Sequence, residues 1–190
     1  MFDPPLKVAA LMSDFKPDWF VAGGWAIDLF LGKETRPHED IEIAVFRRDQ
    51  LELQNYLRDW HLQKVENRAF SDWEKGDFLK LPVFEIHCFN EDYDLLQFEV
   101  LLNETSGKDW VFRRNETITK PLSKLHLESE HGIKFLRPEV VLLYKSKNPR
   151  EKDEQDFQLA LKHLNFESKV WLRNALSICY SEHDWQKKLE

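Results

Sequence analysis

Residues 20–45, FVAGGWAIDLFLGKETRPHEDIEIAV, decide the fold of this chain. The stretch opens with an apolar run that ends at the pair Gly23-Gly24. It continues as an apolar, helix-like segment and closes with carboxylates that alternate with isoleucines. Apolar flanks of this kind belong to a protein core. The polar residues between them therefore need a reason other than packing.

Hydrophobic period and turn signals divide this stretch into a strand, a helix and a second strand. The apolar run before Gly23 predicts a short buried strand, and Gly32 predicts the C-terminal cap of a helix that begins near Trp25. In the segment DIEIAVF, Ile41, Ile43 and Val45 fall on one side and Asp40, Glu42 and Ala44 on the other, which is typical of a half-buried strand. Asp40 and Glu42 would then leave the same face of that strand, about 6.5–7 Å apart at the backbone.

Two carboxylates at this spacing suit one hard cation. Mg²⁺ prefers one or two carboxylates together with phosphate oxygens and water, whereas Asp40 and Glu42 would repel each other without a cation. Gly23 and Gly24 lie at the strand-to-helix turn, where backbone N–H groups can approach a phosphate and the helix directs its positive end toward it. Taken alone, the acids fit a solvent-facing strand and the glycines fit a tight turn. Together they predict a site for a nucleoside triphosphate and its Mg²⁺.

Composition places the chain among folded globular proteins. Its 190 residues are 42% hydrophobic and carry a formal net charge of -7, so it can bury one core. The acidic balance argues against a nucleic-acid partner and favours a cationic small substrate. Cys88 and Cys179 lie far apart and predict reduced thiols, and no apolar run is long enough to span a membrane. We therefore expect a cytoplasmic protein without nucleic-acid or membrane partners, in an oligomeric state that the sequence leaves open.

The rest of the chain predicts an α/β (α+β) domain followed by helices. PPLKVAALMSDF and RDQLELQNYLRDW predict helices, and HLQKVEN, FLKL, FEIHCFN, LLQFEVLLNE and DWVFRRN predict strands. RPEVVLLYKSK, EKDEQDFQLALKHL and SKVWLRNALSICYSEHDWQKKL predict three more helices, and Pro149 separates the first two. We expect a mixed β-sheet flanked by helices in residues 1–135 and a helical C-terminal part in residues 136–190.

The motif GGWAID followed by TRPHEDIEIAV resembles the signature of the nucleotidyltransferase superfamily. It is most similar to the aminoglycoside and lincosamide nucleotidyltransferases, including the aminoglycoside-2''-adenylyltransferases, and RPEVVLLYKSKNPREKDEQDF is similar to the helical segment after their catalytic domain. The resemblance implies the nucleotidyltransferase fold, Mg²⁺, and ATP or another nucleoside triphosphate as co-substrate. It also implies transfer of a nucleoside monophosphate to a hydroxyl of a small molecule, such as an aminoglycoside or lincosamide, and hence antibiotic resistance. Glu42 stands where many relatives have Asp. Glutamate is one methylene longer and still provides a carboxylate ligand.

The resemblance further implies a third carboxylate on a later strand, acting as a metal ligand or as the general base toward the acceptor hydroxyl. Glu99 in LLQFEVLLNE is the predicted residue, because a lone acid in so apolar a run needs a partner. Glu85 in VFEIHCF is its rival, with His87 two residues further on. In this interpretation Asp40, Glu42 and Glu99 are the catalytic and metal-binding residues.

Several residues around these acids are predicted to bind the nucleotide: Gly23, Gly24, Trp25, Arg36, His38, Lys145 and Lys152. The two lysines belong to a local positive cluster in an acidic chain, in the segment that resembles the family's helical part. Lys152 could instead pair with Asp156 at the four-residue spacing. For Arg113 and Arg114 we expect a structural ion pair.

Two other classes of function stay open. The first is a nucleotide-binding or partner-binding module without efficient transfer, such as an antitoxin-like relative. Such a module has no physical reason to keep mutually repelling acids together. The second is a protein-modifying nucleotidyltransferase, which would share the whole site and differ only in the acceptor. Labelling of the protein or of a partner with a nucleotide would distinguish this second class.

Overall fold

A computed structural model describes residues 2–93, 95 and 97–190. The helices in this part of the chain are α1 (Asp3–Leu11), α2 (Gly23–Leu31), α3 (Gln50–Tyr56), α4 (Pro138–Lys145), α5 (Glu151–Leu161), α6 (Phe166–Cys179) and α7 (Trp185–Lys188). The strands are β1 (Trp19–Val21), β2 (Glu42–Phe46), β3 (His61–Glu66), β4 (Ala69–Asp72), β5 (Glu85–Phe89), β6 (Gln97–Ser106), β7 (Asp109–Val111), β8 (Thr119–Pro121), β9 (His126–Glu128) and β10 (Lys134–Leu136).

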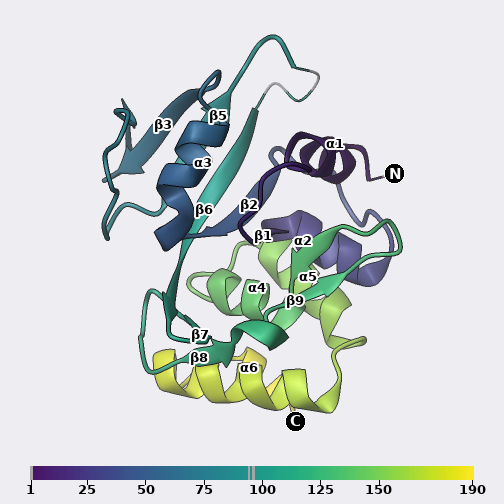
Figure 1. Ribbon diagram of the computed structural model, residues 1–190. Helices are drawn as coiled ribbons and strands as arrows, with labels where there is room; N and C mark the ends of the chain where they lie inside the picture. Colours follow the sequence, from purple (N-terminus) through teal and green to yellow (C-terminus); the bar gives the residue numbers. More distant parts are fainter. Residues whose placement is uncertain (1, 94, 96) are drawn as a thin grey trace.

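One mixed sheet organises the chain (Figure 1). Its strand order is β4-β3-β5-β6-β2-β1-β10-β9, and β7 extends it by pairing with β6 and β8. β2 pairs with β6 and β1 pairs with β10 in parallel, while the other pairs of described strands are antiparallel. These pairings confirm the predicted α+β class, with a mixed sheet flanked by helices.

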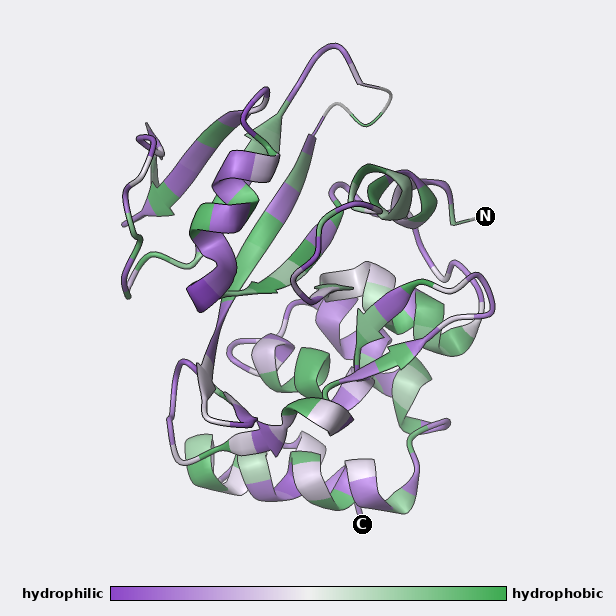
Figure 2. Cartoon of the chain, in the orientation of Figure 1, coloured by the Kyte–Doolittle hydropathy of each residue, from purple (hydrophilic) through white to green (hydrophobic). Residues whose placement is uncertain are grey.

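Strands β5 and β6 bury every second side chain. Ile86 and Cys88 of β5 are buried on one face, as is Val100 of β6, in the period-two pattern of a strand that packs one face on a core. Figure 2 shows the same alternation as green and purple bands along β6. The half-buried side chains of the opposite face include Glu85, His87 and Glu99. The fold thus places three titratable groups on one sheet face.

Helix α3 and the turn after it cover the apolar face of these strands. Leu53 and Leu57 are buried, and the ring of Trp60 meets that of Phe98 on β6 edge to face, with centroids 5.1 Å apart. Phe98 and Glu99 point to opposite faces because they are adjacent on one strand. The face that carries Glu99 is therefore the one that α3 leaves open.

The C-terminal helices pack beside the other half of the sheet. α2 contacts α4 and α5, and α4 contacts α6, which runs next to β7 and β8 in Figure 1. None of the helices in the described residues is long and apolar enough to cross a membrane. Strand β10 ends at Leu136, immediately before these helices begin. The division into domains at residue 135 stays a prediction.

The structure corrects the prediction that FLKL, residues 78–81, forms a strand. The segment is a loop, and Leu79 within it is buried. The side chain of Gln50 accepts a hydrogen bond from the N–H of Leu79 at 2.7 Å and donates to its carbonyl at 3.1 Å. One amide side chain thus satisfies the backbone groups that a neighbouring strand would otherwise bind.

The last predicted helix is two helices. α6 ends at Cys179, and the chain turns so that the ring of Trp185 in α7 stacks on Phe157 of α5, with centroids 4.1 Å apart. The indole N–H of Trp185 also donates to the carboxylate of Glu154 at 2.7 Å. Burial of this tryptophan favours the turn over a continuous helix. The short strands β4, β8, β9 and β10 carry no clear pattern and were not predicted; Leu96, in the run that predicted β6, lies outside the described residues.

Candidate active site

The glycine pair closes β1 and opens α2, and both positions require glycine. Gly23 has a φ of +57°, and a Cβ there would overlap the carboxylate of Glu42. Gly24 is buried, and a Cβ there would lie 2.5 Å from the His38 ring and 2.6 Å from the Arg36 guanidinium. The left-handed backbone and the close side chains explain the pair. Gly23 also lines a cavity, and phosphate binding by the glycines stays a prediction.

The predicted acid pair does not lie wholly on a strand, so the expected backbone geometry is wrong for Asp40. β2 begins at Glu42, and Asp40 is an exposed residue before it. The pairing of β2 with β6 starts only at the register of Glu42 with Glu99, which leaves Asp40 outside the sheet. The acids that the sheet places side by side are therefore Glu42 and Glu99.

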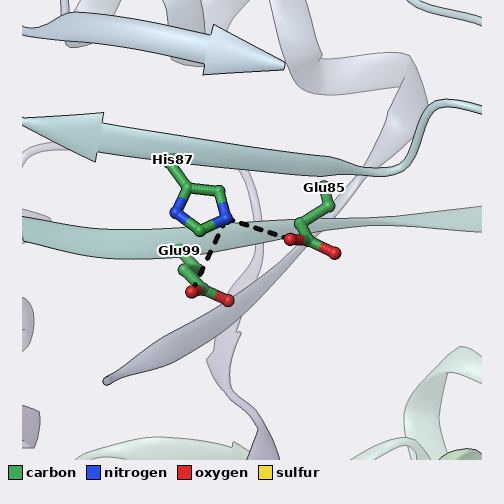
Figure 3. A group of neighbouring side chains, drawn as sticks. All are labelled: Glu85, His87 and Glu99. Atoms are coloured by element: carbon green, nitrogen blue, oxygen red, sulfur yellow. Dashed lines mark hydrogen bonds and ion pairs between the residues drawn. The ribbon is translucent and has the colours of Figure 1, made fainter. Parts of the chain in front are cut away.

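Both alternatives for the third carboxylate lie together beside one histidine (Figure 3). His87 of β5 is the register partner of Glu99 on β6. Its Nε2 lies 2.9 Å from Oε1 of Glu85 and 3.6 Å from Oε1 of Glu99. With Glu42 on the other side of Glu99, a row of titratable side chains crosses β5, β6 and β2. The register of the three strands brings these side chains together, although Glu42 lies far from the others in the sequence.

Burial and mutual repulsion raise the pKa of two acids in this row, Glu42 and Glu99. Burial is the largest cause of the raised pKa of Glu42, and the charge of Asp40 adds to it. Burial also raises the pKa of Glu99 to about 7; His87 opposes this rise and the neighbouring acids add to it. Crowded carboxylates of this kind are stabilised by a divalent cation. The donor set around Glu42 therefore fits Mg²⁺.

A cavity of about 340 Å³ opens beside these acids. Glu42, Glu85 and Gly23 line it together with residues of α4, the loop after α4 and the turn after β7. Its cationic lining residues are Arg113, Arg114, Lys145, Lys147 and Arg150. Cations and carboxylates in one cavity suit a triphosphate, because the phosphate oxygens bind the cations and share a metal ion with the acids.

Of the two predicted nucleotide-binding lysines, Lys145 lines this cavity and Lys152 does not. The Nζ of Lys145 lies 2.9 Å from Oδ1 of Asp153 and 3.0 Å from Oδ2 of Asp156, so two carboxylates hold the ammonium in place. Lys152 pairs with Glu39 at 3.3 Å, and its alternative pairing with Asp156 is not formed. Nucleotide contacts of both lysines stay predictions.

The segment TRPH, residues 35–38, forms a network with buried carboxylates. Arg36 donates to Asp156 of α5 through Nε at 3.2 Å and Nη2 at 3.0 Å. His38 Nε2 lies 2.6 Å from Oδ2 of Asp28, and the Thr35 hydroxyl donates to Oδ1 of Asp28 at 2.6 Å. The segment therefore ties α2 to α5, which explains why polar residues stand between two apolar flanks. Nucleotide contacts of Arg36 and His38 stay predictions.

Trp25 anchors the loop between α2 and β2 from inside the core. It is 4% exposed, its ring lies 4.4 Å from that of His38, and its N–H donates to the carbonyl of Asp40 at 3.1 Å. It is not among the residues that line the cavity. The contacts support a positioning role for Trp25, and a place in the nucleotide pocket stays a prediction.

Arg113 and Arg114 are cavity residues that the sequence pattern did not reveal. Neither forms the expected ion pair within the described part of the chain. The guanidinium of Arg113 lies 3.4 Å from the ring centre of Phe84 and 5.2 Å from that of Tyr144, while Arg114 donates to the Tyr144 carbonyl at 2.9 Å. Burial lowers the pKa of Arg113. Two guanidinium groups without carboxylate partners are therefore available to a phosphate.

We expect Gly23→Ala to lower both stability and activity. Alanine at a φ of +57° costs about 1–2 kcal/mol, and its methyl group would displace the carboxylate of Glu42. Gly107 is the matched control, because it has the same φ of +57° and open space around a Cβ. Thermal unfolding should show a lower midpoint for both variants, whereas transfer should fall at least about tenfold only for Gly23→Ala. An equal loss of activity in both would contradict this account.

Glu99→Gln should stabilise the metal-free protein at pH 8 and have little effect at pH 4.5. The folded chain keeps a proton on Glu99 up to a pKa of about 7, against an ordinary value of 4.5, so stability falls as pH rises through this window. Removing the charge should therefore add about 2 kcal/mol at pH 8, or about 4–8 °C in the unfolding midpoint.

Thermal unfolding in the presence of a chelator, at both pH values, measures this effect of Glu99. Glu66→Gln is the control, because Glu66 is an exposed residue at the end of β3 and should show no gain at either pH. A midpoint for Glu99→Gln that does not depend on pH would show that the carboxylate is not destabilised by its site.

The comparisons with known proteins concern the fold and the family of the chain. Three solved structures share the fold. A lincosamide antibiotic adenylyltransferase, LnuA, with lincomycin bound has 18% identity, a TM-score of 0.58 and coverage of 83% of this chain and 94% of its own. The solution structure of ANT(2'')-Ia has 18% identity, a TM-score of 0.61 and coverage of 100% and 97%. ANT(2'')-Ia in complex with adenylyl-2''-tobramycin has 15% identity, a TM-score of 0.60 and coverage of 94% and 98%.

A comparison of the sequence with models of protein families assigns the chain to a family. No curated protein matches it significantly. The model of the aminoglycoside-2''-adenylyltransferases matches residues 6–117, a range that contains the glycine pair, Asp40, Glu42 and the whole of β6. Because this match covers more than half of the sequence, the chain belongs to the aminoglycoside-2''-adenylyltransferase family of nucleotidyltransferases.

Proposed function

We propose that the chain transfers AMP from ATP to a hydroxyl group of an aminoglycoside or lincosamide, with Mg²⁺ as cofactor. The observation that carries this proposal is that Glu42 is paired in register with Glu99 and lines a cavity that also has a cationic lining. Family membership supports the class of reaction. The intact acids argue for an enzyme over a binding module.

Asp40 and Glu42 would hold the Mg²⁺, which prefers carboxylate and phosphate oxygens. When bound, the ion supplies positive charge that neutralises the phosphates and the charge that develops on them. Lys145, Lys147 and Arg150 line the helical side of the cavity. In this proposal they would bind the triphosphate. Preorganised cations at this position stabilise the pyrophosphate as it leaves.

Glu99 is the proposed general base. The acceptor oxygen attacks the α-phosphorus, a new P–O bond forms, and the bond to the bridging oxygen breaks as pyrophosphate leaves. The hydroxyl proton passes to the carboxylate of Glu99. A pKa near 7, to which burial raises Glu99, suits a base that works at neutral pH.

Acidic side chains and the net charge of -7 favour a cationic acceptor. Two structures of this fold hold antibiotic molecules, lincomycin in one and adenylylated tobramycin in the other. Both antibiotic classes therefore come first in an acceptor panel. The fold alone does not select between them.

Pyrophosphate release tests the proposal. The protein is incubated with Mg²⁺, each nucleoside triphosphate in turn and a panel of aminoglycosides and lincosamides, beside Asp40→Asn and Glu99→Gln. Release from ATP that needs one acceptor and disappears in both variants would support the proposal, and mass spectrometry would identify the adenylylated product. Binding of ATP without release would overturn the small-molecule acceptor in favour of a protein, and a chain that binds no nucleotide would overturn the enzyme.

A further inference from the structure

His87 is a titratable group beside the proposed base that the transfer reaction does not use. Its side chain is 19% exposed and lies between two carboxylates (Figure 3). Phe70 meets its ring edge to face at 4.9 Å, and the ring of Phe89 lies 6.1 Å away. These aromatic contacts limit rotation of the imidazole. Nε2 is thereby kept directed at the acids.

Three ligand atoms of two chemical kinds converge at this point. Nε2 of His87 and one carboxylate oxygen each of Glu85 and Glu99 lie within 4.8 Å of one another. A tetrahedral Zn²⁺ with bonds of about 2.0–2.2 Å would hold neighbouring ligand atoms about 3.4 Å apart. The distances from Nε2, 2.9 Å to Glu85 and 3.6 Å to Glu99, lie on either side of that value. Small rotations of the side chains would therefore seat such an ion.

We propose that Glu85, His87 and Glu99 form a second cation site, separate from the Asp40 and Glu42 pair, that binds a transition metal of the Zn²⁺ type. An imidazole ligand favours Zn²⁺ and related ions, whereas Mg²⁺ favours oxygen donors and keeps its waters. The paired strands β5 and β6 carry the three ligands, so the site is rigid. Because the side chains are only half-buried, water can fill a fourth position.

The site differs from an ordinary histidine–carboxylate pair on the same sheet. His61 Nε2 lies 2.9 Å from Oδ1 of Asp72, with both side chains more than half exposed and only one carboxylate near the ring. Within residues 2–93, 95 and 97–190, the cluster at His87 is the one group of three such ligands at this spacing. The cluster at His87 offers three ligands, whereas the His61–Asp72 pair offers two. A third ligand distinguishes a metal site from a hydrogen-bonded pair.

Occupation of this site has a consequence for catalysis, and this step rests on the proposed function. A Zn²⁺ ion bound to Glu99 takes the oxygen that receives the hydroxyl proton in the transfer. Zn²⁺ at low concentration should therefore inhibit transfer even when Mg²⁺ is present in excess. The second site would make the reaction sensitive to the transition metals around the protein.

Metal binding to the full chain, without nucleotide or acceptor, tests the site directly. Co²⁺ is titrated into metal-free protein, and binding is followed by its visible absorption and by calorimetry with competing Zn²⁺. We expect one bound equivalent that millimolar Mg²⁺ does not displace. His87→Gln and Glu85→Gln should each weaken Co²⁺ binding at least about tenfold, because loss of a ligand costs at least as much as loss of a supporting residue. His61→Gln, the matched control, should bind Co²⁺ like the unaltered chain.

Two results would overturn the site. Co²⁺ affinity that is unchanged in His87→Gln, or Co²⁺ that Mg²⁺ displaces, would leave His87 as a hydrogen-bond partner of the acids only. Thermal unfolding confirms that each variant is folded, and Glu85→Gln provides the test if His87→Gln is not. The Co²⁺ titration uses no nucleotide. Its result is therefore independent of whether the chain catalyses the proposed transfer.

Discussion

Glu42→Gln should abolish nucleotidyl transfer and leave the fold intact. Glu42 is the acid that the register places beside Glu99 and that also lines the cavity, and it is a proposed metal ligand. Glutamine keeps the shape and removes the charge. Loss of a group that stabilises transition-state charge reduces kcat by about 10²–10³-fold, and loss of a metal ligand adds to that. We expect at least about a 10³-fold decrease in pyrophosphate release at saturating ATP and acceptor.

A measurement of the unfolding midpoint distinguishes a catalytic role of Glu42 from a role in the stability of the fold. Burial and the charge of Asp40 raise the pKa of Glu42, so removal of the charge should raise the unfolding midpoint of the metal-free protein or leave it unchanged. Glu66→Gln, on an exposed position of β3, should change neither quantity. Transfer that survives in Glu42→Gln would contradict the proposed site, and loss of transfer together with a lower midpoint would assign Glu42 to the fold.

The elements with long and regular patterns could be predicted from the sequence. The patterns of β2 and β6 and the apolar face of α2 mark elements that the structure contains. The prediction that β2 is half-buried is wrong, because Ala44 and Phe46 on its second face are buried as well. The segment 78–81 shows where pattern fails, since Leu79 is buried while Phe78 and Leu81 are exposed, and a side-chain amide, not a strand, bonds the backbone of Leu79. The strands β8 to β10 have three residues each, which is too short to show a period-two pattern, and β10 also pairs with β1, a strand more than 100 residues earlier in the chain.

The candidate site was predictable where its residues share one motif and hidden where they do not. Gly23 and Glu42 stand in a recognisable order along the chain, and the structure brings them together at one cavity. Arg36 reaches Asp156 across 120 residues of sequence, which no local spacing reveals. Arg113 likewise enters the cavity only because of how the chain folds beyond β7. Long-range contacts, and not residue type, decided which cations face the acids.

Asp156→Ala should be the most destabilising single change in the network that joins α2 to α5. The Asp156 side chain is fully buried and accepts from two cations, with Arg36 Nη2 and Lys145 Nζ each at 3.0 Å. Removing it leaves two largely buried positive charges without that partner. Loss of one member of a buried ion pair costs about 3–5 kcal/mol. At about 2–4 °C per kcal/mol for a chain of this size, the unfolding midpoint should fall by about 6–20 °C.

A second substitution tests whether the loss of stability in Asp156→Ala comes from the unpaired buried cations and not from the cavity that the smaller side chain leaves. Arg36→Ala in the Asp156→Ala background removes one of the unpaired cations, so the double variant should be more stable than the sum of the two single losses predicts. Asp184→Ala is the control, because Asp184 pairs with Lys187 at 3.7 Å with both side chains more than four-fifths exposed, and its midpoint should not move. Strictly additive losses would mean that Arg36 and Asp156 stabilise the fold independently. The segment TRPH would then need another role, and direct contact of Arg36 with the nucleotide would become the better explanation for it.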